Sequence, residues 1–360
     1  MVSYTKNSYL GNPQVKRDGV EEEWDKKKLR EYQKCMKDPA YFCKKYVKVI
    51  HLDKGLVPFK LYDYQEQMFE HFSDNRFSIV LACRQSGKSI SSVGYLLWYT
   101  LFHPEKTIAI LANKGAVARE MLSRITLALE NLPFFLQPGT KALNKGSIEF
   151  SNNSKILAAA TSGSSIRGLS INLLFLDEFA FIDDDAKFYT STYPVVSAGK
   201  DTQIIICSTA NGIGNVYHKL WEGASQGTNE YKPFRIDWWD VPGRNKTWQK
   251  QTIANTSELQ FEQEFGNKKS YTIGLTTPIA TITLFSYLFF NHHVYGDIGD
   301  PRTALMLAAL LGYLMISPIH FAKFPLLSFK YSRSNSIMLI VFIFSFIAFV
   351  ALKKIATVCR

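Results

Sequence analysis

The feature that most constrains the fold is the segment Ala-Cys-Arg-Gln-Ser-Gly-Lys-Ser at residues 82–89, which fits the pattern A-x4-G-K-S. It follows the apolar run 76–82 and precedes a helical pattern from Lys88 to about Phe102. A glycine-containing turn between a buried strand and a helix presents backbone N–H groups and the helix N-terminus to an anion. The segment therefore predicts a strand–loop–helix unit, with Ala82 in place of the usual first glycine of the pattern.

Short apolar runs recur along the chain and predict a sheet. They are residues 76–82, 107–112, 171–177 and 202–208. These runs are too continuous for strands with one polar face, so they indicate a parallel sheet covered by helices on both faces. Further helices are predicted from Lys88 and from Gly115, and residues 145–159 predict a hairpin with Asn152 and Asn153 at its turn. The fold class expected for residues 23–267 is α/β, a P-loop NTPase with a mostly parallel sheet flanked by helices.

The loop residues predict a binding site for ATP and Mg²⁺. Gly87 lets the backbone amides approach the phosphates without a Cβ in the way. Lys88 brings a positive charge to the β- and γ-phosphates, and the Ser89 hydroxyl ligates Mg²⁺. The residues assigned to the nucleotide are Gln85, Ser86, Gly87, Lys88 and Ser89.

A second acidic motif follows the third apolar run, as Leu173-Leu174-Phe175-Leu176-Asp177-Glu178. Its two acids come at the carboxyl end of a buried strand, where ligands of open α/β sheets bind. Asp177 is predicted to hold Mg²⁺, and Glu178 is predicted to orient and deprotonate the attacking water. The alternative is that the two acids only cap a helix N-terminus.

Other residues carry two interpretations each. Arg84 can stabilise charge on the γ-phosphate or form an ion pair with a nearby carboxylate. Tyr64 can stack on adenine and Gln65 can bind its edge, or both can be ordinary residues of a helix. Residues 207–212 (Cys-Ser-Thr-Ala-Asn-Gly) can sense the γ-phosphate or only form a turn.

The two ends of the chain differ in character. Residues 1–22 are polar and turn-rich, which predicts a flexible arm. Residues 23–46 show helical spacing and predict one or two helices, and residues 246–265 predict two closing helices. The five cysteines show no zinc-binding spacing and are interpreted as free thiols in a reducing compartment. The net charge of +11 favours anionic partners, either nucleic acid or a lipid surface.

Residues 268–360 form a hydrophobic tail, and residues 271–360 hold only 7 Lys+Arg and 2 Asp+Glu. Three stretches are each near the length needed to cross a bilayer. These are residues 273–290, 303–319 and 336–352. They predict three transmembrane helices, with residues 1–267 in the cytoplasm by the positive-inside rule. The alternative for each stretch is a buried core helix.

Residues 25–267 resemble the ATPase half of a tailed-bacteriophage terminase large subunit, of the contractile-tailed phage type. The segments that carry the resemblance are LYDYQEQM, CRQSGKS, ILANKGAVAREMLSR, LPFFLQPG, NKGSIEF, SSIRGLSINLLFLDEFAFI and CSTANGIGNVYHKLWE. The resemblance implies a packaging motor, which hydrolyses ATP to drive viral double-stranded DNA through a portal into an empty capsid. It further implies a homo-oligomer on the portal protein and a partnership with the terminase small subunit.

The resemblance also implies roles for individual residues. These are nucleotide and Mg²⁺ binding for Lys88 and Ser89, the Walker B acid for Asp177, the catalytic carboxylate for Glu178, the adenine contact for Gln65, and coupling for Ser208 and Thr209. Arg84 matches the arginine of the family's Walker A loop. Arg167, in the SSIRG loop, is the candidate for contact with a neighbouring subunit.

The chain departs from that family after residue 267. A ribonuclease-H-like nuclease domain is expected there, but Asp297 and Asp300 are the only acids after Glu264. Because such a nuclease needs a cluster of acids around two metals, no nuclease activity is expected. The tail instead resembles the closing helices of a bacterial phosphatidylserine synthase of the CDP-alcohol phosphotransferase type, without its aspartate-rich motif. Two unrelated parts meeting near residue 270 suggest a fused or wrongly joined gene.

Two alternative functions remain open at this point. A helicase-like nucleic-acid ATPase also uses an upstream glutamine and an Asp-Glu pair, although its further motifs are missing from this sequence. A catalytically inactive membrane-anchored fusion would keep the nucleotide site only as a remnant. ATP turnover and duplex unwinding distinguish these two from the packaging motor.

Overall fold

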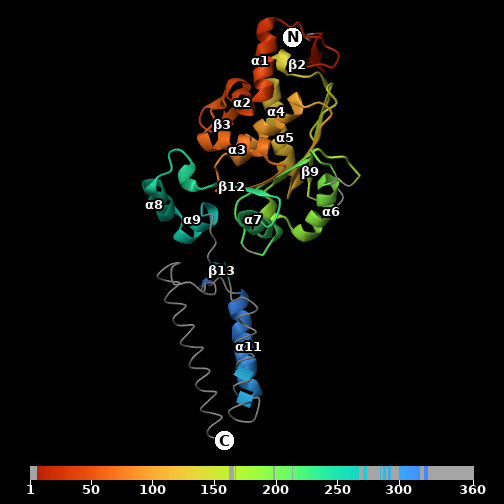
Figure 1. The fold of residues 1–360 in the computed structure, drawn as a ribbon. Helices are drawn as coiled ribbons and strands as arrows, with labels where there is room; N and C mark the ends of the chain where they lie inside the picture. The colour runs from red at the N-terminus through yellow and green to blue at the C-terminus, as the bar shows by residue number, and fades with distance from the viewer. Residues whose placement is uncertain are drawn as a thin grey trace. The chain divides into compact units, whose positions relative to one another are not determined.

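The structure is a computed structural model, and it describes residues 6–161, 166, 168–197, 199–212, 214–266, 271–273, 284, 287–288, 291–292, 300–316 and 320–322. The chain divides into two compact units, Met1–Lys268 and Lys269–Arg360. The first unit holds the central sheet, the helices that cover it and the candidate site residues (Figure 1).

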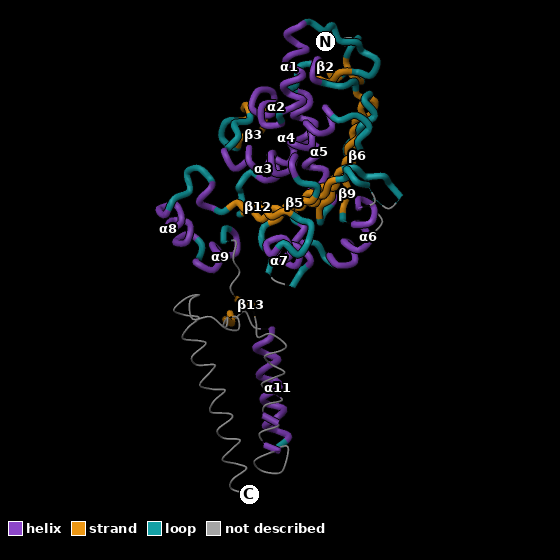
Figure 2. The backbone as a smooth tube through the Cα atoms, in the orientation of Figure 1, coloured by secondary structure: helices purple, strands orange, loops and turns teal. Residues whose placement is uncertain are grey.

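Within the described residues, eight strands form the central sheet of the first unit, in the order β12-β5-β11-β10-β6-β9-β8-β7 (Figure 2). The strands are β5 (Phe77–Ala82), β6 (Thr107–Ala112), β7 (Thr140–Leu143), β8 (Ser147–Phe150), β9 (Lys155–Ala160), β10 (Leu173–Asp177), β11 (Gln203–Ser208) and β12 (Lys232–Ile236). From β12 to β9 all neighbours are parallel, and β9, β8 and β7 are antiparallel. The mostly parallel sheet predicted from the four apolar runs is confirmed, and so is the hairpin, with Asn153 at positive φ in its turn.

Helices cover both faces of this sheet because alternate residues of the buried strands point to opposite sides. On β5, Val80 and Ala82 join one hydrophobic core, whereas Ile79 and Leu81 join the other. The first core contains side chains of α3 (Asp63–Asp74), α4 (Lys88–Phe102) and α5 (Gly115–Glu130). The second contains side chains of η2 (Phe179–Phe181), α6 (Asp185–Ser197) and α7 (Val216–Gln226). Figure 1 shows these two helix groups on opposite sides of the sheet.

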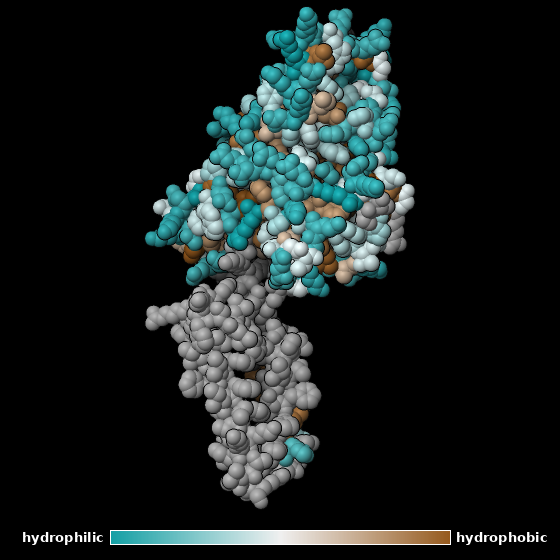
Figure 3. Space-filling view, in the orientation of Figure 1, coloured by the Kyte–Doolittle hydropathy of each residue, from teal (hydrophilic) through white to brown (hydrophobic). Residues whose placement is uncertain are grey.

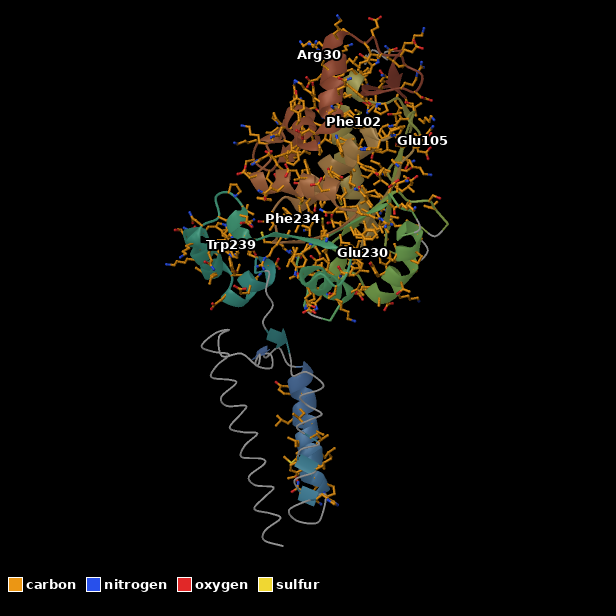
Figure 4. The ribbon with its side chains drawn as sticks, viewed as in Figure 1. Arg30, Phe102, Glu105, Glu230, Phe234 and Trp239 are labelled. Atoms are coloured by element: carbon orange, nitrogen blue, oxygen red, sulfur yellow. The ribbon has the colours of Figure 1, made fainter. Side chains whose placement is uncertain are left out.

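The N-terminal segments pack on the first core. Helices α1 (Lys26–Lys37) and α2 (Pro39–Tyr46) agree with the helical spacing of that region. Phe102, labelled in Figure 4 at the end of α4, contacts the rings of Tyr32 and Phe42 at centroid distances of 5.1 and 5.4 Å. The short elements nearby are β3 (Lys48–His51), β4 (Gly55–Pro58) and η1 (Phe134–Leu136).

The prediction of a flexible arm at residues 1–22 is wrong for the described part of that segment. Strands β1 (Ser8–Tyr9) and β2 (Asn12–Lys16) form an antiparallel pair. Val15 is fully buried, and the Gln137 side chain accepts from the Lys16 N–H at 2.9 Å and donates to the Gln14 carbonyl at 2.9 Å. This segment is therefore ordered by a buried amide more than 100 residues away in sequence.

The first unit closes with a small aromatic lobe after β12. It consists of η3 (Trp238–Asp240), α8 (Lys246–Asn255) and α9 (Glu258–Glu264), which agree with the two helices predicted for residues 246–265. Trp239, labelled in Figure 4, is 57% exposed on this lobe. Over the face of the first unit seen in Figure 3, hydrophilic side chains dominate and hydrophobic ones form small separate spots.

The second unit is described only in part. It contains β13 (Tyr271–Ile273), paired antiparallel with β14 (His320–Ala322), and the helix α11 (Pro301–Ile316). Helix α11 overlaps the second predicted membrane span, but among the described residues none of the helices is long and apolar enough to cross a membrane. Most of the span at 273–290 and all of the span at 336–352 lie outside the described residues. Those two spans and the cytoplasmic location stay predictions.

Candidate active site

Three loops meet at the carboxyl edge of the sheet because three neighbouring parallel strands end there. Strand β11 lies between β5, which leads into residues 83–87, and β10, which ends in Asp177. In the register of the sheet, Asp177 is paired with Cys207, and Ser208 is paired with Leu81. The acidic motif and the polar motif at Ser208 therefore lie beside the phosphate-loop sequence, as the order of the sequence motifs predicts.

The loop at residues 83–87 has the backbone conformation that its glycine permits. Gly87 lies in the left-handed region at φ 77°, and Gln85 adopts φ 56°. A Cβ on Gly87 would lie 2.7 Å from Nε2 of Gln65, so a larger residue would also clash with that amide. Gly87 is the N-cap of α4, whose first turn holds Lys88 and Ser89. The structure thus gives the loop and helix N-terminus that a phosphate site requires.

Lys88 and Glu178 form the central ion pair of the site. Lys88 is 8% exposed, and its Nζ lies 2.5 Å from Oε1 of Glu178. Burial lowers the pKa of Lys88, but the Glu178 carboxylate outweighs burial and holds that pKa above its ordinary value. Burial likewise raises the pKa of Glu178, but Lys88 and Thr209 bring it below its ordinary value. Both groups are therefore charged at neutral pH.

The second oxygen of Glu178 is bound by the end of β11. Its Oε2 accepts hydrogen bonds from the Thr209 backbone N–H at 3.1 Å and the Thr209 hydroxyl at 3.3 Å, and lies 3.4 Å from the Ser208 hydroxyl. Ser208 Oγ also accepts from the Ala180 N–H at 3.1 Å. Glu178 itself has φ 50°, an uncommon conformation for a non-glycine residue that is often found at functional sites. Ser208 and Thr209 therefore contact the predicted catalytic carboxylate directly.

The environment of the Asp177 carboxylate fits a bound Mg²⁺. It is 3% exposed, and within the described residues its Oδ1 is a buried oxygen with no hydrogen-bond partner. Burial raises its pKa to about 6, although nearby Lys88 opposes this. Ser89 lies half-buried at the start of α4. A carboxylate and a hydroxyl are the hard oxygen donors that Mg²⁺ accepts beside phosphate oxygens and waters, so these two residues fit the ion.

The metal would depend on the nucleotide for further ligands. Within the part of the chain that the structure describes, no group of three His, Cys, Asp or Glu side chains is arranged to hold a metal ion. Ser86 adds another buried hydroxyl whose Oγ has no partner among the described residues.

In this structure Arg84 forms an ion pair with a nearby carboxylate, which is the second of its two predicted roles. Its Nε lies 2.5 Å from Oε2 of Glu264 on α9, and its backbone N–H donates to the Glu264 carbonyl at 3.1 Å. The side chain is therefore held by the aromatic lobe on the outside of the loop. Its action on the γ-phosphate stays a prediction.

Tyr64 and Gln65 both contact the loop. The Tyr64 hydroxyl donates to the Ser86 carbonyl at 2.6 Å, and the residue is 9% exposed. Gln65 is 2% exposed, and its Oε1 accepts from the Tyr62 N–H at 2.9 Å. The structure thus shows Tyr64 bound to the phosphate loop and Gln65 capping the start of α3, with its Nε2 beside Gly87, and their contact with adenine stays a prediction. Arg167 lies outside the described residues, and its role also stays a prediction.

One residue of the site has no signal in the sequence. Arg244, between η3 and α8, donates from Nη1 to the Arg84 carbonyl at 3.0 Å and from Nη2 to the Gln85 carbonyl at 3.1 Å. It lies about 160 residues beyond the loop, in a stretch without a recognisable motif. The contact of Arg244 with the phosphate loop can be recognised only from the three-dimensional structure.

Replacing Asp177 by Asn is expected to stabilise the metal-free protein at neutral pH. Because the folded-state pKa of about 6 lies above the ordinary value of 3.8, the folded form binds the extra proton and wild-type stability falls as pH rises through that range. The gain should approach about 3 kcal/mol above pH 6 and vanish near pH 4. Chemical denaturation of wild type and Asp177→Asn in EDTA at several pH values measures it. Asp183→Asn, an exposed neighbour, is the control, and a gain independent of pH would contradict the assignment.

The fold and the site together define a P-loop ATPase-like domain: a mostly parallel α/β sheet whose phosphate loop, buried lysine and paired acids lie at the carboxyl edge of its parallel strands. The family model described as terminase large subunit, T4likevirus-type, N-terminal, matches residues 79–267, which is more than half of the 360 residues, so the chain belongs to this family.

Solved structures agree with this fold. The HK97 bacteriophage large terminase is 15% identical, with a TM-score of 0.56, over 70% of this chain and 58% of that one. The large terminase ATPase domain of Thermus phage P74-26 is 20% identical, with a TM-score of 0.50, over 58% of this chain and 94% of that domain. This chain therefore matches nearly all of the Thermus phage ATPase domain but little more than half of the HK97 large terminase chain.

Proposed function

We propose that this chain binds and hydrolyses ATP to drive viral double-stranded DNA into a capsid. The observation that carries the proposal is the contact of Lys88 with Glu178. Beside this pair lie the Asp177 oxygen that has no partner among the described residues and the hydroxyl groups of Ser208 and Thr209. These residues supply a cation for the phosphates, a metal ligand, a general base and polar groups that can sense the γ-phosphate, all at the carboxyl edge of the sheet. Membership of the terminase large subunit family supports duplex DNA as the substrate that this ATPase would move.

In the proposed reaction, the loop N–H groups and Lys88 bind the β- and γ-phosphates of ATP. Ser89 and Asp177 would hold Mg²⁺, which neutralises charge on the phosphate oxygens when it is bound. Glu178 takes a proton from a water molecule while the water oxygen bonds to the γ-phosphorus. The bond between that phosphorus and the β–γ bridging oxygen breaks, and ADP and phosphate leave.

Ser208 and Thr209 give a physical route from the γ-phosphate to the rest of the sheet. A triphosphate in the loop would compete with Glu178 for Lys88. Any movement of the Glu178 carboxylate then changes its hydrogen bonds to Thr209, at the end of β11. The proposed coupling therefore consists of a transfer of Lys88 from Glu178 to the phosphates and back.

The partners proposed from the family are duplex DNA, the terminase small subunit, the portal protein and further copies of this chain on the portal. The positive net charge of the chain is compatible with the polyanion. Absence of nuclease activity also stays a prediction, which incubation with duplex DNA and Mg²⁺ or Mn²⁺ checks.

Purified full-length chain is expected to release phosphate from ATP only with Mg²⁺, and faster when linear duplex DNA is added. With procapsids bearing the portal, it is expected to protect DNA from nuclease digestion. An absence of Mg²⁺-dependent hydrolysis would favour the inactive fusion and overturn the proposal. Separation of the strands of a short duplex would instead favour the helicase-like ATPase.

A further inference from the structure

The outer side of the phosphate loop is held by the aromatic lobe, and Arg244 makes the main contact. Its two terminal nitrogens donate separately to two successive carbonyls of the loop, those of Arg84 and Gln85. Nη1 also lies 3.5 Å from the Cys83 sulfur. A planar guanidinium suits this double contact because its donors form a fixed fork.

The lobe fixes the position of this guanidinium. Its carbon lies 4.8 Å from the ring centroid of Trp248 and 5.2 Å from that of Phe265. Both rings belong to one cluster with Trp238 and Phe261, at centroid distances between 5.1 and 5.8 Å. Cation–π contact with packed rings orients the arginine, so its donors stay directed at the loop.

The two hydrogen bonds determine where the loop N–H groups point. A trans peptide unit is planar, and its N–H and C=O point in opposite directions. With the carbonyls of Arg84 and Gln85 directed at Arg244, the N–H groups of Gln85 and Ser86 point away from it, toward the inside of the loop. The Tyr64 hydroxyl does the same for the next peptide unit by binding the Ser86 carbonyl. Such successive N–H groups form a concave anion site.

We propose that Arg244 is a positioning residue for ATP, which aims the N–H donors of the phosphate loop and links the nucleotide to the α8–α9 lobe. This inference rests on the proposed function, since it assigns a device to the same site. Arg84 adds a second link, because its N–H and side chain both bind Glu264. ATP affinity and the position of the lobe are therefore thermodynamically coupled, and a change at either one alters the other.

Arg244→Gln in the full-length chain is expected to raise both the KM for ATP and the Kd of a fluorescent ATP analogue by about ten- to a hundredfold, from the loss of two charge-assisted hydrogen bonds. The kcat should change less. Arg244→Lys, which keeps the charge but not the fork, should fall between wild type and Arg244→Gln. Lys250→Gln, which removes an exposed charge from the following helix α8, should leave KM unchanged.

A residue with only a structural role would lower the folded fraction, and so reduce apparent kcat at an unchanged KM. That result, or an unchanged Kd in a folded Arg244→Gln, would overturn the inference. If Arg244→Gln does not fold, Arg244→Lys decides by the same two constants. Wild-type chain that neither binds nor hydrolyses ATP would overturn the proposed function itself, which separates the two failures.

Discussion

Replacing Glu178 by Gln is expected to lower kcat for ATP hydrolysis by about 10²–10⁴-fold, the usual contribution of a positioned general base. The amide oxygen can still accept from Thr209, so the local hydrogen bonds survive while the base is lost. ATP binding should persist, because the carboxylate competes with the phosphates for Lys88 rather than binding them. Phosphate release at saturating ATP and binding of a fluorescent analogue measure the two effects separately.

The matched control is Glu230→Gln, at an exposed glutamate ahead of β12 (Figure 4). Its kcat should equal that of the wild type. Hydrolysis by Glu178→Gln at a near wild-type rate would remove Glu178 from the chemistry and leave it only as the partner of Lys88. Loss of both binding and hydrolysis would point to damage to the loop instead.

Replacing Lys88 by Ala is expected to abolish detectable ATP binding. The substitution removes the buried cation at the phosphate loop and leaves Asp177 and Glu178 without their positive neighbour. It should also lower the free energy of unfolding by about 1–3 kcal/mol at neutral pH. This is less than the cost of breaking a fully buried ion pair, because Glu178 keeps some contact with water. That cost should shrink at acid pH, as Glu178 becomes protonated.

Titration with a fluorescent ATP analogue and chemical denaturation at pH 7 and pH 4 measure these effects. Lys187→Ala, at an exposed lysine of α6, should match the wild type in both. Retained nucleotide affinity in a folded Lys88→Ala variant would contradict the phosphate role of the lysine.

The sequence alone predicted those strands and helices whose patterns lie within a short stretch of the chain. Strands β5, β6, β10 and β11 have continuous apolar runs, and the Gly-Lys-Ser turn specifies a strand before it and a helix after it. Because parallel strands place their carboxyl ends together, the meeting of Lys88 with Glu178 also followed from motif order.

What the sequence could not supply depends on contacts between distant segments. Strand β12 lies at the sheet edge, contains Pro233 and is mostly exposed, and it lacks the buried apolar run of its neighbour β5. The N-terminal hairpin looked like a flexible arm because its ordering partner, Gln137, is far along the chain. The contacts of Arg84 and Arg244 likewise join residues about 160 to 180 positions apart, and no spacing rule connects them.

Strand β12 has a mechanical consequence. Among the described strands it pairs only with β5, in parallel register from Lys232 to Ile236, and the Ile236 carbonyl continues the ladder to the Cys83 N–H at 3.0 Å. A pull along the strand axis on the chain beyond Ile236 would load β12 and β5 in shear, so that the hydrogen bonds between the two strands share the force. Such a pull would move β5 as a unit and shift the phosphate loop that follows it, whereas peeling would break the hydrogen bonds one at a time.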